Sequence, residues 1–192
     1  MFLNRACVVV YVGSNNMIQL PVAVFSNKQI IAHDSDGARD LCVRSNFGEM
    51  KPGGHVMFMA LEALYLVQKE RLSVVDSRHK SLSFKQLFVK IAKIDKQLMS
   101  RFAVYTDFRD RGYVIKTALK FGADFRVYER GVKPGVDHAK WIVFVVNESD
   151  KLSWYDFCAK NRVAHSTKKK LLIAVVDGEG DVSYFEINWT RP

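Results

Sequence analysis

Two short, wholly apolar runs most constrain how this chain can fold: residues 141–146 (WIVFVV) and 171–176 (LLIAVV). Each run is six residues long and rich in Val and Ile, the composition and length typical of a buried strand. A helix that crosses a membrane needs about 20 consecutive apolar residues. The two runs therefore predict strands inside a folded domain, and we expect no membrane as a partner.

The segments around these runs alternate between strand and turn. Further strands are predicted over 113–118, 125–129, 139–147 and 182–189, with a helix near 153–161. The short loops between them favour an antiparallel or mixed sheet with helices packed against it. Upstream, Ser83 stands three residues before Gln86, the spacing of a capping box, and apolar residues then recur at steps of three and four. This pattern predicts an amphipathic helix over 84–98, followed by a helix over 102–109.

The first 75 residues predict a smaller domain. Strands are expected over 6–12, 22–25, 29–33 and 72–75, a short helix over 37–47, a Gly/Pro loop over 48–55 and a helix over 56–68. The predicted fold is α+β (mixed α/β). It has an N-terminal α/β domain (1–75), a linker and connecting helix (76–100), and a C-terminal domain (101–192) whose mixed, mainly antiparallel sheet is flanked by helices.

The positive charge is concentrated in the second part of the chain. Residues 1–75 carry 7 Lys and Arg against 6 Asp and Glu, whereas residues 76–192 carry 22 against 14. A basic region of this kind favours a polyanionic partner, because each phosphate contact releases condensed counterions.

Most common enzyme motifs are absent. The sequence has no GxxxxGK[ST], no GxGxxG after a predicted strand and no HExxH. Cys7, Cys42 and Cys158 are far apart and form no CxxC, so we expect a cytoplasmic protein with neither disulfides nor a zinc site. Asp124 and Glu129 flank one predicted strand, but no third acidic residue completes a metal-binding set. We expect no cofactor and no metal ion.

Four segments of the basic part carry a recognisable pattern. They are RGYVIKTALKFGADFRVYERG at 111–131, DHA at 137–139, RVAHSTKKK at 162–170 and DGEGD at 177–181. In these motifs, and in EALYL at 62–66, the chain closely resembles archaeal-type tRNA-splicing endonucleases, and specifically their catalytic subunits. The resemblance covers most of the chain and is tightest after Arg111. It implies a restriction-endonuclease-like nuclease domain at the C-terminus.

The resemblance also implies an active site. The family's catalytic Tyr, His and Lys fall on Tyr128, His138 and Lys169. Such a trio can cleave RNA without a metal ion, through attack of the 2′-hydroxyl that leaves a 2′,3′-cyclic phosphate and a 5′-hydroxyl. A histidine suits the acid and a lysine the stabilisation of the phosphorane charge, whereas the tyrosine either acts as base or only positions the 2′-hydroxyl. Lys168 and Lys170 flank Lys169, so a slip of one residue in the match would select a neighbour.

Two further groups follow from the same resemblance. Arg162 matches the first of two side chains that grip a bulged base, and Trp189 stands near the second; alternatively, Trp189 caps the core. The turn with Asp177, Glu179 and Asp181 matches a loop that inserts into a basic cleft of another subunit. We therefore expect precursor tRNA as substrate and a homo-oligomer or hetero-oligomer, most simply a tetramer.

Two alternatives remain at this point. The first is a noncatalytic structural subunit of the same complex, which would be expected to lack one or more of the three catalytic residues. The second is a metal-dependent nuclease, against which the poor clustering of carboxylates already counts. The sequence does not distinguish a homotetramer from a heterotetramer.

Overall fold

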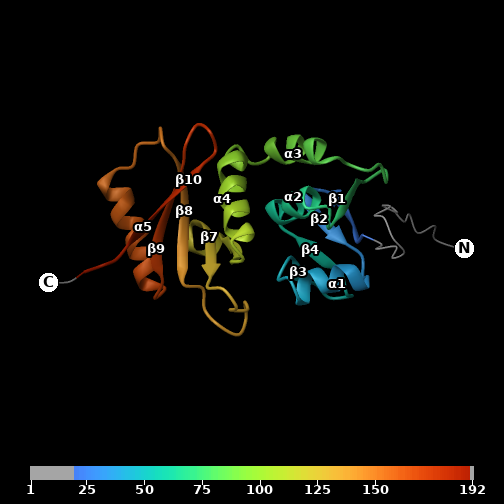
Figure 1. Ribbon diagram of the computed structural model, residues 1–192, viewed down its shortest axis with the longest axis horizontal. Coiled ribbons are helices and arrows are strands. Elements are labelled where there is room, and N and C mark those ends of the chain that lie inside the picture. The colour runs from blue at the N-terminus through green and yellow to red at the C-terminus, as the bar shows by residue number, and fades with distance from the viewer. Residues whose placement is uncertain (1–19, 191–192) are drawn as a thin grey trace, which may run out of the picture. The chain divides into compact units, whose positions relative to one another are not determined.

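The computed structural model describes residues 20–190 and divides the chain into two compact units, 1–96 and 97–192 (Figure 1). The strand expected over 6–12 lies outside the described residues. Each unit contains a mixed β-sheet together with helices, so the fold class is α+β, as predicted. Residues 20–190 include no helix with both the length and the apolar character that crossing a membrane requires.

The N-terminal unit is built around a five-stranded sheet of order β3-β4-β2-β1-β5. β1 pairs with β5 in parallel and with β2 antiparallel, and β4 lies antiparallel to both β2 and β3. The elements are β1 (Val22–Ser26), β2 (Gln29–Ala32), α1 (Asp36–Val43), β3 (Glu49–Met50), β4 (Val56–Phe58), α2 (Ala60–Gln68), β5 (Ser73–Asp76) and α3 (Phe84–Ala92).

The helix predicted over 56–68 begins four residues later than expected. Val56–Phe58 instead form β4, because they pair with Ile30–Ala32 of β2. The buried carboxylate of Glu62 marks the start of α2, since it accepts hydrogen bonds from the backbone N–H of Met59 (2.9 Å) and of Gly48 (3.0 Å). The apolar periodicity of this segment correctly indicated a helix over its later residues. Its first residues form a strand instead, because they pair with a strand distant in sequence.

The helix predicted over 84–98 is divided in two. The capping box is confirmed: Ser83 Oγ accepts from the N–H of Gln86 and the Gln86 side chain accepts from the N–H of Ser83. However, α3 ends at Ala92, and α4 (Leu98–Asp110) starts four residues before the expected Phe102. The apolar stripe is shared between two cores, since Ile91 is buried in the first unit, Ile94 is exposed and Leu98 is buried in the second unit.

The C-terminal unit contains a second five-stranded sheet, of order β10-β9-β8-β7-β6. Only β8 and β9 are parallel, and α5 forms the crossover between them; the other pairings are antiparallel. The elements after α4 are β6 (Val114–Ala118), the 3-10 turn η1 (Leu119–Phe121), β7 (Ala123–Tyr128), β8 (Trp141–Asn147), α5 (Trp154–Ser166), β9 (Lys170–Val176) and β10 (Val182–Ile187).

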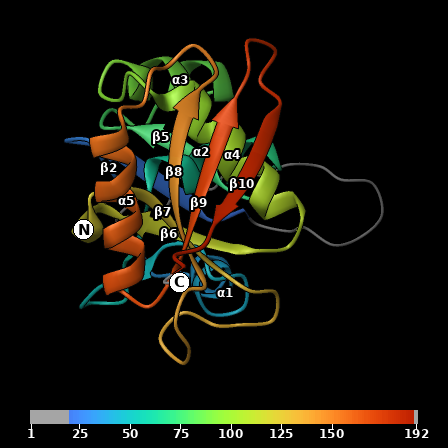
Figure 2. The ribbon, with the colours of Figure 1, turned by 90° about the vertical axis from the view of Figure 1, so that its left-hand side faces the viewer.

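The two apolar runs of the sequence form most of β8 and β9, which lie inside this sheet. Helices α5 and α4 cover its opposite faces, as Figures 1 and 2 show. On the α5 face, Ala164 packs with Ile142, Phe144, Leu171 and Ile173. On the α4 face, the ring of Tyr105 lies 6.3 Å from that of Phe125. Residues of both faces are buried, which explains why these strands are continuously apolar rather than alternating.

Candidate active site

The strand order brings the ends of three strands to one edge of the C-terminal sheet. Val127 near the end of β7 pairs with Trp141 at the start of β8, and Trp141 pairs with Lys170 at the start of β9. Tyr128 and Lys169 each lie one residue beyond these pairings. Because neighbouring strands are about 4.8 Å apart, the backbones of these two residues are separated by roughly 10 Å. We call this side of the sheet the Lys169 edge.

Tyr128 and Lys169 also extend from the same face of the sheet. Arg126 pairs with Ile142, which pairs with Leu171, and the last two pack on the α5 face. Side chains two residues apart on a strand point to the same face, so Tyr128 follows Arg126 and Lys169 precedes Leu171 on this face. Both side chains are therefore directed to one surface at the Lys169 edge.

Tyr128 is held firmly at the end of β7. It is only 4% exposed and packs with Val114, its partner on β6, and with Ala139. The Arg126 guanidinium lies over its ring, 5.9 Å from the ring centroid. The resemblance did not single out Arg126; its position two residues before Tyr128 on a strand was the available signal.

His138 lies in the connection from β7 to β8, three residues before β8 begins, and its side chain is exposed. This segment returns the chain to the Lys169 edge, where Lys140 donates a backbone hydrogen bond to Val127 (2.9 Å) and its ammonium pairs with Glu129. That pairing raises the pKa of Lys140 above its ordinary value. His138 therefore lies two residues before the backbone contact that joins this connection to the end of β7.

The three consecutive lysines before and in β9 have different environments. Lys169 is partly buried, donates from Nζ to the carbonyl of Thr167 (2.9 Å) and lies 5.7 Å from the centroid of the Phe121 ring. Lys168 adopts a left-handed backbone conformation (φ 54°) that turns the chain from α5 into β9. Lys170 pairs with Glu186 at 2.6 Å. By strand alternation, only the middle lysine shares the face of Tyr128.

His165, which the sequence analysis did not single out, brings Arg162 and Trp189 to one region. The ring of Trp189 stacks on that of His165, with centroids 5.3 Å apart and planes 24° apart. His165 lies three residues after Arg162 on α5, so the two share a face of the helix. Trp189 is 44% exposed. The signal for His165 was its place in the RVAHS motif.

The acidic turn lies at the opposite edge of the sheet. β9 runs from Lys170 to Val176, so Asp177 is about 26 Å from Lys169 at about 3.3 Å per residue. The Asp177 carboxylate stabilises the turn itself, accepting from the N–H of Glu179 and of Asp181 at 2.9 Å each. The side chains of Glu179 and Asp181 are exposed. The turn therefore does not contribute to the Lys169 edge of the same chain.

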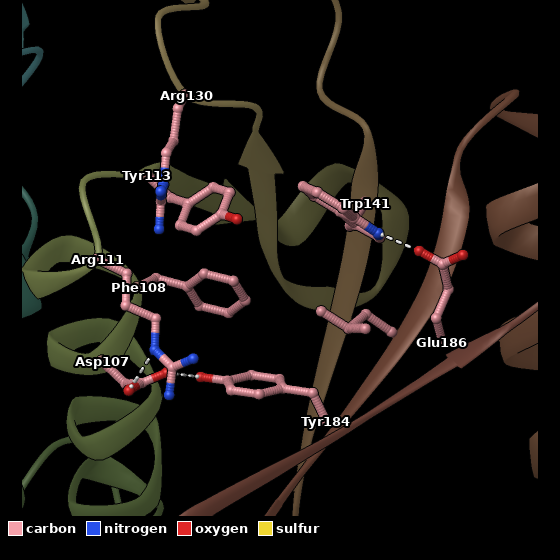
Figure 3. Close-up of a pocket in the computed structure, with 9 residues that line it drawn as sticks. Asp107, Phe108, Arg111, Tyr113, Arg130, Trp141, Tyr184 and Glu186 are labelled. Carbon is pink, nitrogen blue, oxygen red and sulfur yellow. Dashed lines mark hydrogen bonds and ion pairs between the residues drawn. The ribbon is translucent and has the colours of Figure 1, made fainter.

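A hollow of about 200 Å³ lies on the α4 face of the C-terminal unit. Figure 3 shows its lining: Asp107, Phe108, Arg111, Tyr113, Arg130, Trp141, Leu172, Tyr184 and Glu186. None of the residues predicted to form the active site lines it.

The charges of this hollow are largely paired within it. Asp107 accepts from the Tyr184 hydroxyl (2.7 Å) and from Arg111 (2.9 Å). Burial, followed by this hydrogen bond to Asp107, raises the pKa of Tyr184 well above its usual range. Lys170 and the Trp141 N–H bind Glu186 and lower the pKa of its carboxyl. The bond to Asp107 fastens β10 to α4, and the contacts of Glu186 fasten β10 to β8 and β9.

The two carboxylates considered as metal ligands have other partners. Asp124 forms an ion pair with Arg101 (2.7 Å) and accepts from the backbone N–H of Val145 (2.8 Å), and Glu129 pairs with Lys140. Between residues 20 and 190 no three His, Cys, Asp or Glu side chains gather as a metal site would require.

Comparison with known proteins identifies the family of the chain. Residues 22–88 match the N-terminal domain of the tRNA intron endonuclease family, and residues 98–184 match its catalytic C-terminal domain. A tRNA-splicing endonuclease of Pyrococcus furiosus is 38% identical over 166 residues, which cover 86% of this chain and 94% of the relative.

Two further relatives, also called tRNA-splicing endonucleases, show the same similarity. The protein of Thermococcus onnurineus is 42% identical over 148 residues, covering 77% of this chain and 84% of the relative. The protein of Nanoarchaeum equitans is 40% identical over 138 residues, covering 69% and 88%. Both domains and most of the chain are thus matched, and the chain belongs to the tRNA intron endonuclease family.

Proposed function

We propose that this protein is the catalytic subunit of a tRNA-splicing endonuclease, which cleaves precursor tRNA at intron–exon junctions within bulge–helix–bulge elements. The observation that carries the proposal is the common edge reached by Tyr128, His138 and Lys169, with the first and last on one face of the sheet. A bulged nucleotide can rotate its 2′-hydroxyl into line with the leaving oxygen, which stacking in a duplex opposes. The RNA would be recognised by shape rather than by base sequence.

The reaction is a transfer of the phosphate within the RNA. The 2′-oxygen forms a bond to phosphorus and the bond to the 5′-oxygen breaks, giving a 2′,3′-cyclic phosphate and a 5′-hydroxyl. His138 donates a proton to the departing 5′-oxygen. Lys169 stabilises the negative charge that develops on the nonbridging oxygens. We assign Tyr128 to the 2′-hydroxyl, where it either accepts the proton itself or positions the hydroxyl so that the proton passes to water.

The second group of side chains would hold the flipped base. Arg162 supplies a flat cation and Trp189 a flat aromatic ring, and both stack well on nucleobases. We assign His165 as a positioning residue, because its ring contact fixes the plane of Trp189. The last turn of α5 connects this group with Lys169, whose backbone N–H donates to the carbonyl of Ala164 (2.9 Å).

We further propose that the chain works in an oligomer, with the acidic turn as one contact. Glu179 and Asp181 are exposed on this turn, and Phe185 on the edge strand β10 is 57% exposed. An exposed aromatic on an unpaired strand edge is a common site of association. Either identical subunits or a second, structural subunit would satisfy this contact.

Incubation of the purified chain with an intron-containing precursor tRNA, with and without excess chelator, tests the proposal. We expect cleavage at both junctions in either condition, with cyclic phosphate ends detected by mass spectrometry. Loss of cleavage on chelation, restored by a divalent ion, would instead support a metal-dependent nuclease. Binding of the precursor tRNA without cleavage would support a noncatalytic structural subunit.

A further inference from the structure

A group of lysines outside the proposed active site surrounds a shallow hollow on the N-terminal unit. The hollow has a volume of about 490 Å³ and is lined by Asp76, Leu82, Gln86 and Val89 together with four lysines: Lys80, Lys85, Lys90 and Lys93. We call it the lysine hollow. It contributes strongly to the charge of this unit, since residues 76–96 carry 6 Lys and Arg against 2 Asp and Glu.

The four lysines are not neutralised by the protein. Within residues 20–190, none of the four forms an ion pair with a carboxylate. The one acidic residue of the lysine hollow, Asp76, uses its side chain to accept backbone hydrogen bonds from Arg78 (2.8 Å) and Lys80 (3.0 Å). These bonds lower the pKa of Asp76, so its carboxylate stays ionised and committed to the turn. Neighbouring ammonium groups repel one another, and the single carboxylate of Asp76, which interacts electrostatically with Lys90, offsets only part of that repulsion among four lysines.

The surface that presents the lysines is well fixed. Leu87 and Ile91 anchor the opposite side of α3 in the core, where they are 0% and 2% exposed. The capping box of Ser83 and Gln86 fixes the start of the helix. Lys85, Val89 and Lys93 follow one another at steps of four, so they form a row on the outward side.

We propose that the lysine hollow binds the phosphate backbone of the precursor RNA. Unpaired, closely spaced ammonium groups around a concave surface match a chain of phosphates, since each contact releases a condensed counterion. Lysine is a point charge without the planar geometry that selects particular bases, so this contact adds affinity independent of sequence. The inference rests on the proposed function for the identity of the RNA, but concerns residues that take no part in the cleavage step.

The triple variant Lys85→Ser, Lys90→Ser and Lys93→Ser tests the inference. Binding of an intron-containing precursor tRNA is measured by fluorescence anisotropy between 50 and 300 mM KCl, and cleavage is measured at saturating RNA. We expect binding at least about tenfold weaker near 0.15 M salt, and a slope of log affinity against log salt that falls by about 2–3. The cleavage rate at saturating RNA should not change.

Two controls make the result specific. The variant Lys85→Arg, Lys90→Arg and Lys93→Arg keeps the charge and should bind as the parent does. Lys51→Ser removes a lysine of the same unit that pairs with Glu49 (2.8 Å) and should leave the salt slope unaltered. Unchanged affinity and slope in the triple Ser variant would overturn the inference, as would a change in oligomeric mass with RNA binding intact, which would indicate a protein partner. If the parent binds but does not cleave the RNA, the proposed function fails while this measurement remains interpretable.

Discussion

The two edges of the C-terminal sheet differ sharply in charge. At the Lys169 edge, three consecutive lysines precede or begin β9, and Arg130 and Lys133 lie in the connection that leads to β8. At the opposite edge, the segments 148–150 and 177–181 carry five carboxylates, and the Glu148 side chain accepts from the N–H of Gly178 (3.0 Å). We call this second side the acidic edge.

The parallel pairing of β8 and β9 produces this separation. Both strands begin at the Lys169 edge and end at the acidic edge. The loops that precede the two strands therefore lie at one edge, and the turns that follow them lie at the other. An acidic turn beside the proposed active site would repel RNA, whereas one about 26 Å away leaves the site electropositive. This difference leads us to propose that one edge serves RNA and the other serves a protein partner. Variants on each side test that division, and a variant at Tyr184, outside both edges, gives a reference.

The largest effects are expected from the proposed active-site residues of the Lys169 edge. His138→Ala should lower the cleavage rate by about 10²–10⁴, because the leaving 5′-oxygen would depart without a proton donor. Lys169→Ala should lower it by about 10²–10³ through loss of charge stabilisation. Both are measured by single-turnover cleavage of precursor tRNA, with binding measured in parallel.

Lys168→Ala is the matched control, since this lysine adjoins Lys169 but does not share the face of Tyr128. It should retain most of the cleavage rate. A loss as large as that of Lys169→Ala would show that net charge at this edge, rather than one positioned ammonium, is required. Equal losses of binding and cleavage in the His138 and Lys169 variants would make these residues contacts, not catalysts.

An intermediate effect is expected from the stacked pair at the end of α5. Trp189→Ala should weaken RNA binding by about 1–3 kcal/mol, the usual contribution of one base stacked on an aromatic ring. His165→Ala should weaken RNA binding by a smaller amount than Trp189→Ala does. His165→Phe should restore the binding, because a flat ring again supports Trp189. If His165→Phe behaves like His165→Ala, the contact depends on the imidazole itself and the positioning role is wrong.

Features that depend on local sequence patterns could be predicted, whereas features that depend on contacts between residues distant in sequence could not. The apolar runs of β8 and β9 and the capping box at Ser83 are local patterns, and both were confirmed. The end of α3 at Ala92 could not be predicted, since the apolar stripe continues but its later residues bury in a different core. The division of 56–68 into β4 and α2 likewise depended on pairing with β2. His165 was missed because its contact with Trp189 spans 24 residues of sequence.

At the acidic edge, substitution of Asp177 should affect stability, whereas substitution of Glu179 and Asp181 should affect association between subunits. Glu179→Gln with Asp181→Asn should weaken association between subunits, detected by mass photometry, while leaving the thermal stability of the chain unchanged. Asp177→Ala should lower the free energy of unfolding by about 1–3 kcal/mol, because two backbone N–H groups lose their acceptor. Association unaffected by the double variant would remove the protein-binding role from this edge.

The smallest effect should come from Tyr184, which belongs to neither edge. Tyr184→Phe removes the hydroxyl that donates to Asp107, and should lower the free energy of unfolding by about 0.5–1.5 kcal/mol at neutral pH without altering cleavage. Burial raises the pKa of Tyr184, so the folded protein retains this proton more tightly than the unfolded chain does. Its contribution is therefore complete below the ordinary tyrosine pKa of 10.0 and is lost as pH rises above that value. Thermal unfolding of both proteins is measured between pH 8 and 11. Above pH 10 the parent should lose stability faster than the Phe variant. Parallel curves would mean that the hydroxyl does not make the contact with Asp107 in the folded state.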